Sequence, residues 1–167
     1  VFTADDCIPD REWLTAIAHH YASDPRAVVG GGIVNGLPDN IYSQASHLVT
    51  DYVVRHRPDQ RTAGLITPNN LAVSRELYHR VGGFDPSFVF SGEDRDFCDR
   101  WLEHGLALRH APDARVTHRH PLTLTSFIRQ QYDYGRGSAQ FRWQRGRHRL
   151  ERLGYYLRLI ASPWRVA

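Results

Sequence analysis

Short apolar runs alternate with helical segments along most of this chain, and this alternation limits its fold more than any other feature. The runs suited to strands are 1–4, 27–34, 106–110 and 115–118. The segments suited to helices, several with apolar residues at helical spacing, are 10–23, 40–56, 72–81, 92–104, 123–136 and 148–160. Alternating strands and helices are typical of an α/β fold, which we therefore predict, with residues 57–64 as a polar connection.

The composition predicts a folded chain. Of the 167 residues, 41% are hydrophobic and four are Trp, which is enough to bury a core. The chain has no Met and begins inside an apolar run, so we expect an internal fragment. Cys7 and Cys98 are expected to be buried thiols, which fits a cytoplasmic location better than a secreted one. No apolar run reaches the ~20 residues of a membrane span.

Charge divides the chain into two parts. Residues 129–167 hold nine Arg and two acids, whereas residues 1–128 hold 12 Arg and 16 acids. We therefore predict an acidic part, 1–128, and a basic helical tail, 129–167. An anionic partner is the usual reason for such a tail.

Four arginines of the tail recur at helical spacing beside an apolar stripe: Arg142, Arg145, Arg149 and Arg152. Such a helix can lie on an anionic membrane surface, which would place the protein peripherally on the inner face of the cell membrane. A solvated helix that packs on another part of the protein explains the pattern equally well. Nucleic acid is not an expected partner, because the remainder is acidic and no nucleic-acid motif is present.

Two clusters of acids could carry chemistry. Asp5 and Asp6 follow the first apolar run, where paired carboxylates can bind a hard divalent cation or simply form a solvated turn. Glu93 and Asp94 follow Ser91 and Gly92 at the start of a predicted helix. Ser91 followed three residues later by an acid is a capping pattern, and the acids also suit the helix dipole. A carboxylate held at a helix start can instead act as a general base.

Two histidines end the last predicted strand. His118 and His120 fall on one face of that strand, with Arg119 on the other. Imidazoles placed in this way can approach a metal, although a histidine in a strand is more often structural. Spacing alone leaves both interpretations open.

Taken together, these segments resemble the family 2 glycosyltransferases of the GT-A fold. The similarity runs from Val1 to about Gly137 and rests on FTADDCIPD (2–10), NLAVSR (70–75) with VGGFD (81–85), GEDRDFCDRW (92–101) and PDARVTH (112–118). Each segment is a weak signal alone, but their order and spacing are specific. The resemblance implies the C-terminal part of a GT-A domain followed by a helical tail, with the nucleotide-binding N-terminal half missing.

The resemblance also implies roles. Asp6, with Asp5, matches the family's metal motif and would bind Mg²⁺ or Mn²⁺ at the diphosphate of a nucleotide-sugar donor. His118 would be the late metal ligand, with His120 as the second candidate. Asp94 matches the base that deprotonates the hydroxyl of a saccharide or lipid-linked acceptor. Residues implied in acceptor binding are Glu93, Asn70, Gly82, Gly83 and Trp101.

Two departures from the family pattern refine the prediction. Ala4 stands where many relatives have an acid, which leaves only Asp5 and Asp6 in the metal motif. Processive relatives carry a Gln-x-x-Arg-Trp motif, but after Gln130 this chain has Asp133 and Tyr134 at the Arg and Trp places. We therefore predict an inverting, non-processive transferase of cell-envelope sugars whose fragment alone is inactive. The alternative is a catalytically degenerate module that binds carbohydrate or scaffolds a membrane complex.

Overall fold

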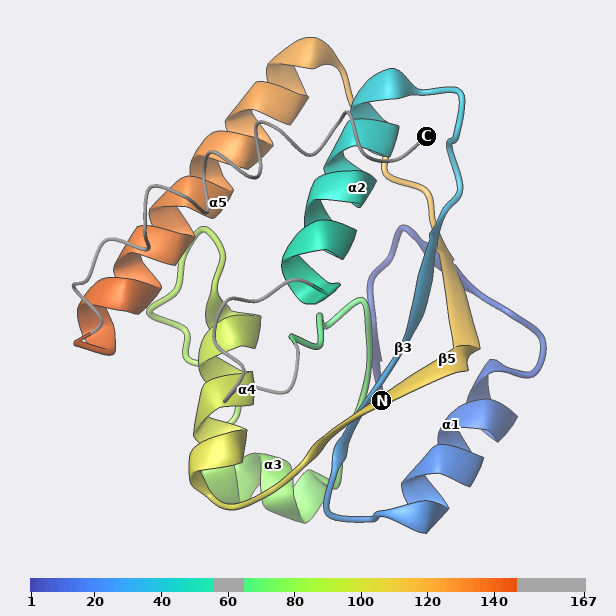
Figure 1. Ribbon diagram of the computed structural model, residues 1–167, viewed down its shortest axis with the longest axis vertical. Coiled ribbons are helices and arrows are strands. Elements are labelled where there is room, and N and C mark those ends of the chain that lie inside the picture. Colours follow the sequence, from blue (N-terminus) through green and yellow to red (C-terminus); the bar gives the residue numbers. More distant parts are fainter. Residues whose placement is uncertain (56–64, 147–167) are drawn as a thin grey trace.

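The predicted alternation of strands and helices is present in the computed structural model, which describes residues 1–55 and 65–146 (Figure 1). Its elements are β1 (Phe2–Thr3), β2 (Cys7–Pro9), α1 (Trp13–Ser23), β3 (Val28–Asn35), α2 (Ile41–Arg55), β4 (Asn70–Ala72), α3 (Arg75–Val81), α4 (Glu93–Glu103), β5 (Leu108–His118) and α5 (Leu124–Gln144). The connection predicted at 57–64 and the helix predicted at 148–160 lie outside the described residues.

The described strands form one mixed sheet in the order β1-β4-β3-β5-β2. The central pair, β3 and β5, is parallel, and the other pairs are antiparallel. The buried strand predicted at 1–4 is instead the short edge strand β1, whose Thr3 is exposed. Because β1 and β2 lie on opposite edges and only residues 4–6 separate them, this connection carries Asp6 to the β5 side of the sheet.

The two strands predicted at 106–110 and 115–118 are a single strand, β5. Its pairing with β3 shifts between Gly31, which faces Ala111, and Gly32, which faces Arg115. Residues 112–114 are therefore a bulge inside the strand, where we expected a turn between strands. The proline and the aspartate that suggested a turn lie in this bulge.

The core occupies both faces of the sheet, because neighbouring strand residues point in opposite directions. Val28 and Leu71 belong to a cluster that includes Phe97 and Trp101 of α4, whereas Val29 belongs to a second cluster with residues of α1. Helix α1 thus covers one face and α4 the other, as Figure 1 shows. Cys7 and Cys98 are both buried thiols that are not joined in a disulfide, which confirms the prediction.

Two helices begin differently from the sequence prediction. Helix α3 begins at Arg75 instead of residue 72, because Asn70–Ala72 forms β4 and the Ser74 hydroxyl accepts from the Leu77 amide. Helix α4 begins after Gly92, whose φ of 101° favours glycine, and has no side-chain cap. The Ser91 hydroxyl, predicted as that cap, instead donates to the Asp133 carbonyl of α5 at 3.3 Å.

Helix α5 is longer than predicted and crosses the boundary drawn at residue 128. Just after it, Arg145 binds Asp96 and Glu103, with Nε 3.0 Å from Asp96 Oδ1 and Nη1 2.8 Å from Glu103 Oε2. Its side chain is only 16% exposed, so Arg145 joins α5 to α4 and is not free for an anionic surface. Arg149 and Arg152 lie outside the described residues.

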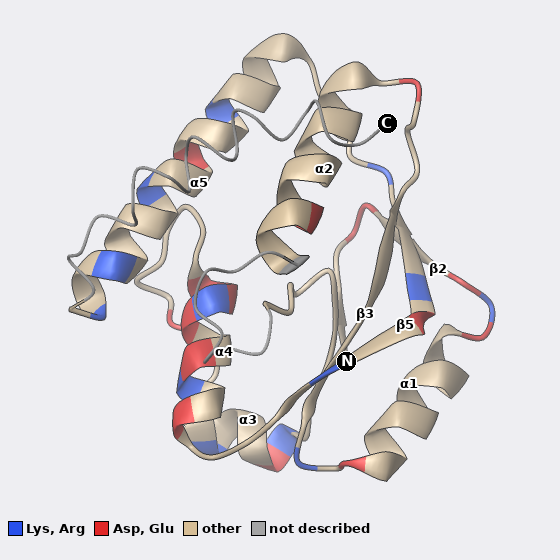
Figure 2. Ribbon diagram, in the orientation of Figure 1, with Lys and Arg blue, Asp and Glu red and all other residues tan. Residues whose placement is uncertain are grey.

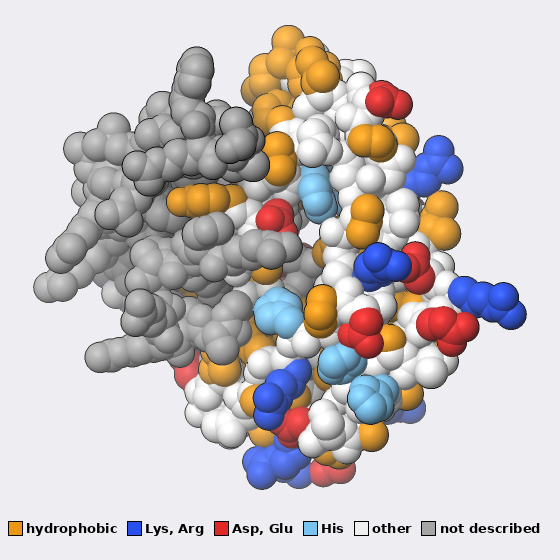
Figure 3. Space-filling view, turned by 45° about the vertical axis from the view of Figure 1, so that its right-hand side comes forward, with side chains coloured by type: hydrophobic (Ala, Val, Ile, Leu, Met, Phe, Trp, Pro, Cys, Tyr) orange, Lys and Arg blue, Asp and Glu red, His pale blue; other side chains and the backbone are white. Residues whose placement is uncertain are grey.

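The visible surface does not gather charge of one sign. Acidic and basic residues alternate along α4 (Figure 2), and both signs are scattered over the face drawn in Figure 3. Within residues 1–55 and 65–146, no helix is both long and apolar enough to cross a bilayer.

Gly31 tests how tightly the bulge is packed. A Cβ there would clash with the Ala114 carbonyl and the Asn70 side chain, neither of which can retreat without breaking its own contacts. We expect Gly31→Ala to lower the free energy of unfolding of the full-length protein by about 2 kcal/mol or more, measured by urea denaturation. Gly135→Ala is the control, because a Cβ at that helical position meets nothing within 4 Å. Gly135→Ala should leave the free energy of unfolding unchanged or raise it by up to about 1 kcal/mol. Equal effects of Gly31→Ala and Gly135→Ala would contradict tight packing at the bulge.

Candidate active site

A cleft of about 1450 Å³ lies among β3, α2, β5, the start of α4 and α5. Residues far apart in sequence line it, and they include Glu93, Asp94, His118, His120, Gln130 and Tyr134. Both acids of the Glu93–Asp94 pair and both histidines of the last strand therefore face the same space.

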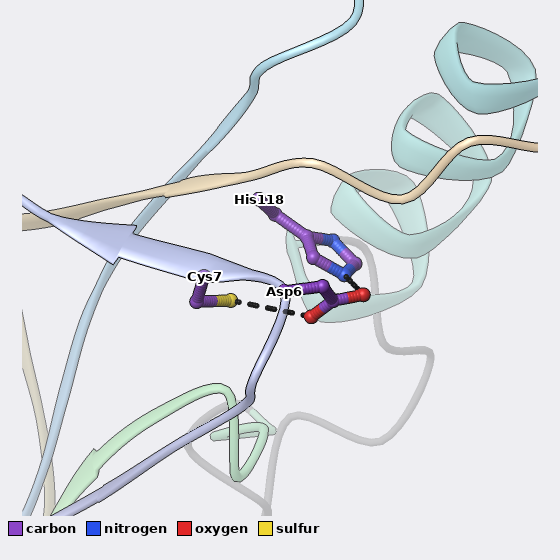
Figure 4. A group of neighbouring side chains, drawn as sticks. All are labelled: Asp6, Cys7 and His118. Atoms are coloured by element: carbon purple, nitrogen blue, oxygen red, sulfur yellow. Dashed lines mark hydrogen bonds and ion pairs between the residues drawn. The ribbon is translucent and has the colours of Figure 1, made fainter.

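Asp6, in the acidic turn, contacts the two histidines that line this cleft. Its Oδ2 atom lies 3.0 Å from His118 Nε2 and 3.0 Å from His120 Nδ1. The two rings stack with centroids 5.3 Å apart and an interplanar angle of 20°, although β5 ends at His118 and His120 lies beyond the strand. Asp6 lies at the turn into β2 and points toward His118 at the end of β5 (Figure 4).

The histidines favour the ionised form of Asp6. Burial alone would raise the pKa of this carboxyl, but hydrogen bonds and positive charge from His120 and His118 outweigh burial and lower it. The neighbouring thiol behaves in the opposite way, because burial is the main cause that raises the pKa of Cys7. Asp6 is therefore the anionic group at this turn, while Cys7 stays a neutral thiol.

The donor atoms around Asp6 suit a divalent cation. One ligand atom each from Asp6, Cys7 and His118 lie within 4.8 Å of one another. A carboxylate and an imidazole fill only part of the shell of an ion such as Mn²⁺ and leave positions for phosphate oxygens and water. Asp5 is not a member of this group, and its side chain is exposed.

Tyr134 of α5 borders the same cleft as Glu93 and Asp94, and it is 39% exposed. Partial burial raises the pKa of its phenol, and the negative charges of Asp94, Glu93 and Asp6 raise it further. Tyr134 is absent from the predicted site residues, although its place in the Gln-x-x-Arg-Trp comparison was a usable signal.

Asp94 is held at the first turn of α4. Its Oδ1 atom accepts a hydrogen bond from the Arg95 amide at 2.7 Å. The amides of a helix N-terminus favour negative charge, so α4 stabilises the carboxylates of Glu93 and Asp94. Both side chains are partly exposed and border the cleft.

Asn70 is a buried structural residue, 1% exposed. Its Oδ1 atom accepts from Trp13 Nε1 at 2.9 Å, and its Nδ2 atom donates to the carbonyls of Gly32 at 2.9 Å and Ala114 at 2.7 Å. Both amide hydrogens are used within the protein. Asn70 therefore joins α1, β3 and the bulge of β5, and it has no free donor for an acceptor.

Three other residues expected to bind the acceptor also have structural positions. Trp101 is fully buried, and its Nε1 atom donates to the Ala107 carbonyl at 3.1 Å. Gly82 and Gly83 end α3 with φ angles of 94° and 64°, and neither lines the cleft. Of the predicted acceptor residues, Glu93 alone borders the cleft with a side chain free of such a role.

Comparison with known proteins gives the class. Residues 3–167 match the family model described as glycosyl transferase family group 2. Two curated relatives, both named pre-mycofactocin glycosyltransferase and from two strains of Mycobacterium tuberculosis (CDC 1551 / Oshkosh and ATCC 25618 / H37Rv), are each 32% identical over 143 residues. The match covers 83% of this chain and 30% of each relative.

The chain belongs to the family 2 glycosyltransferases. Its mixed sheet and covering helices fit a GT-A-like domain of that family, which confirms the predicted fold class. It spans about a third of the length of the curated relatives that it matches.

The structural role of Asn70 can be measured. Asn70→Leu would leave the Gly32 and Ala114 carbonyls and the Trp13 Nε1 donor without a partner in the core. We expect it to lower the free energy of unfolding by about 2–4 kcal/mol in urea denaturation of the full-length protein. The control Asn69→Leu, at a half-buried neighbour, should cost less than about 0.5 kcal/mol. A stable Asn70→Leu protein with weakened acceptor binding would favour the role predicted from sequence.

Proposed function

We propose that the full-length protein transfers a sugar from a nucleotide-diphosphate donor to an acceptor hydroxyl, with inversion and one sugar at a time. The observation that carries this proposal is one cleft that is lined by Glu93, Asp94 and His118, with the Asp6 carboxylate 3.0 Å from the His118 ring. Family membership supports the reaction class.

Asp94 is the proposed general base. Its carboxylate borders the cleft at the N-terminus of α4, where the helix dipole favours negative charge, so it can take the proton of an acceptor hydroxyl. The hydroxyl oxygen then forms a bond to the anomeric carbon as the bond to the nucleotide diphosphate breaks on the opposite side. One displacement inverts the anomeric centre and needs no covalent intermediate.

Glu93 and Tyr134 are the proposed acceptor contacts. Glu93 can accept hydrogen bonds from acceptor hydroxyls, and the Tyr134 ring offers an apolar surface with a polar end. Because Asp133 and Tyr134 replace the Arg and Trp of the processive motif, a single addition fits this chain better than chain extension.

Asp6 and His118 would hold the Mg²⁺ or Mn²⁺ that we propose as cofactor. Such a cation, when bound, neutralises charge that develops on the departing diphosphate. Asp6 would contribute the negative charge from the turn before β2, and His118 an imidazole nitrogen from the end of β5, where the two side chains point toward each other. Ala4 removes one acid of the family motif, so fewer protein ligands are available than in many relatives.

The acceptor is to be found by screening. Saccharides, lipid-linked saccharides presented on anionic vesicles, and the pre-mycofactocin that the relatives are named for form the first panel. A lipid-linked acceptor would fit a peripheral position on the inner face of the membrane.

Asp94 can be tested as the base by one isosteric change. We expect Asp94→Asn to reduce kcat for sugar transfer by about 10²–10⁴-fold, because the amide cannot take the proton, with donor affinity nearly unchanged. The control Asp113→Asn changes an exposed carboxylate that binds His20 at 2.7 Å outside the cleft, and it should keep full activity. Normal turnover of Asp94→Asn would exclude Asp94 as the base. No transfer by the unaltered protein with any nucleotide sugar would favour the degenerate binding module.

Metal dependence gives an independent test. Chelation of divalent cations should abolish transfer, and added Mn²⁺ or Mg²⁺ should restore it. In Asp6→Asn, activity should be low and should require much higher Mn²⁺, because the anionic ligand is lost. Asp5→Asn should keep nearly normal Mn²⁺ dependence, since Asp5 is exposed and outside the ligand group. Transfer at full rate in chelator would contradict the metal role.

A further inference from the structure

A line of hydrogen bonds runs from α2 through α5 to Asp6. The Ser46 hydroxyl lies 2.7 Å from Gln130 Oε1, and Gln130 Nε2 lies 3.2 Å from His120 Nε2. On its other side, His120 Nδ1 lies 3.0 Å from Asp6 Oδ2. Ser46 is 8% exposed, so this line begins in the protein interior.

The Asp6 carboxylate determines which group donates and which accepts at each hydrogen bond of this line. An ionised Asp6 carboxylate can only accept, so the proton of a neutral His120 ring must be on Nδ1. His120 Nε2 is then an acceptor and needs the amide NH₂ of Gln130, which turns Oε1 of that amide toward the Ser46 hydroxyl. With the amide turned the other way, Gln130 Oε1 and His120 Nε2, which are both acceptors, would face each other.

The same arrangement leaves His120 without a nitrogen for a cation. Nδ1 carries a proton toward Asp6, and the lone pair of Nε2 is taken by Gln130. Helix α2 also holds the backbone of His120, because the buried Ser43 hydroxyl donates to its carbonyl at 2.6 Å. His120 is therefore better placed to orient Asp6 than to act as the second metal ligand considered from sequence.

We infer that Gln130 and Ser46 are positioning residues that fix His120 in its Nδ1-protonated tautomer, so that His120 holds the Asp6 carboxylate in place. The tautomer is a property of these side chains alone, whereas its consequence for metal binding rests on the proposed function. Partners of this kind, which orient a ligand without touching the metal, typically change metal affinity by about 10–100-fold when removed.

The tautomer can be observed directly. Nitrogen NMR of histidine-labelled, metal-free full-length protein in mildly alkaline buffer separates Nδ1–H from Nε2–H rings, and the His120 signal is identified by its loss in His120→Gln. We expect the Nδ1–H pattern in the unaltered protein. In Gln130→Met, which keeps the side-chain length, that preference should disappear, because nothing then donates to Nε2.

Metal affinity supplies the second readout. With Mn²⁺ alone as the probe, followed by the electron paramagnetic resonance of the free ion, Gln130→Met should raise the dissociation constant about tenfold. Ser46→Ala should act in the same direction but more weakly. The double variant should match Gln130→Met, because Ser46 acts only through Gln130. Gln144→Met, an exposed α5 residue that binds Ser87 at 3.2 Å, should change neither readout.

The outcomes separate this inference from the proposed function. An Nε2–H ring at His120 in the unaltered protein would overturn the inference, as would a folded Gln130→Met protein with an unchanged tautomer and Mn²⁺ affinity. If Gln130→Met fails to fold in thermal denaturation, Ser46→Ala decides by the same two readouts. Absence of sugar transfer with the tautomer and Mn²⁺ effects intact would contradict the proposed function and leave the inference standing.

Discussion

The hydrogen bonds of Asn70 to the carbonyls of Gly32 and Ala114 are the constraint on which the site depends. They hold the bulge of β5 against β3 at the point where the strand register changes. After that point β5 pairs with β2, and His118 comes to lie opposite Cys7. Since Asp6 precedes Cys7, the same register brings the His118 ring to the Asp6 carboxylate. A buried amide thus sets where the proposed metal-binding groups meet.

Three segments place the candidate site residues: the connection before β2, the start of α4, and α5. Asp6 is placed by a connection between opposite edges of the sheet, and Asp94 by the N-terminus of α4. Helix α5 contributes Tyr134 to the lining of the cleft. Arg145, just after α5, binds Asp96 and Glu103 of α4 and so joins the two helices. Helix α4 carries the proposed base and α5 carries a proposed acceptor contact. The ion pairs of Arg145 join these two helices, so interactions outside the cleft fix their relative position.

The sequence predicted features that depend on neighbouring residues, and it mispredicted features that depend on contacts with distant segments. The ranges of α1, α2 and α4 were predicted to within a few residues, because the residues that define a helix are neighbours along the chain. The Pro112–Asp113 pair indicated a turn, but pairing with β3 on one side and β2 on the other keeps β5 continuous through a bulge. Ser91 has the form of a helix cap, yet its hydroxyl binds α5. Asn70 and Trp101 have the polar and aromatic character of sugar-binding residues, and only burial shows that they support the scaffold.

The sequence by itself determined the α/β class, the family and the chemical types of the site, because these follow from periodicity and from short motifs in a fixed order. Only the tertiary structure decided which carboxylate meets which histidine, that Tyr134 shares a cleft with Glu93 and Asp94, and that Gln130 faces His120. Asp6 and His120 are separated by more than a hundred residues, and Ser46 and Gln130 by more than eighty. Hydrogen bonds over such separations leave no periodic trace in the chain, since they depend on strand register and helix packing and not on neighbouring residues.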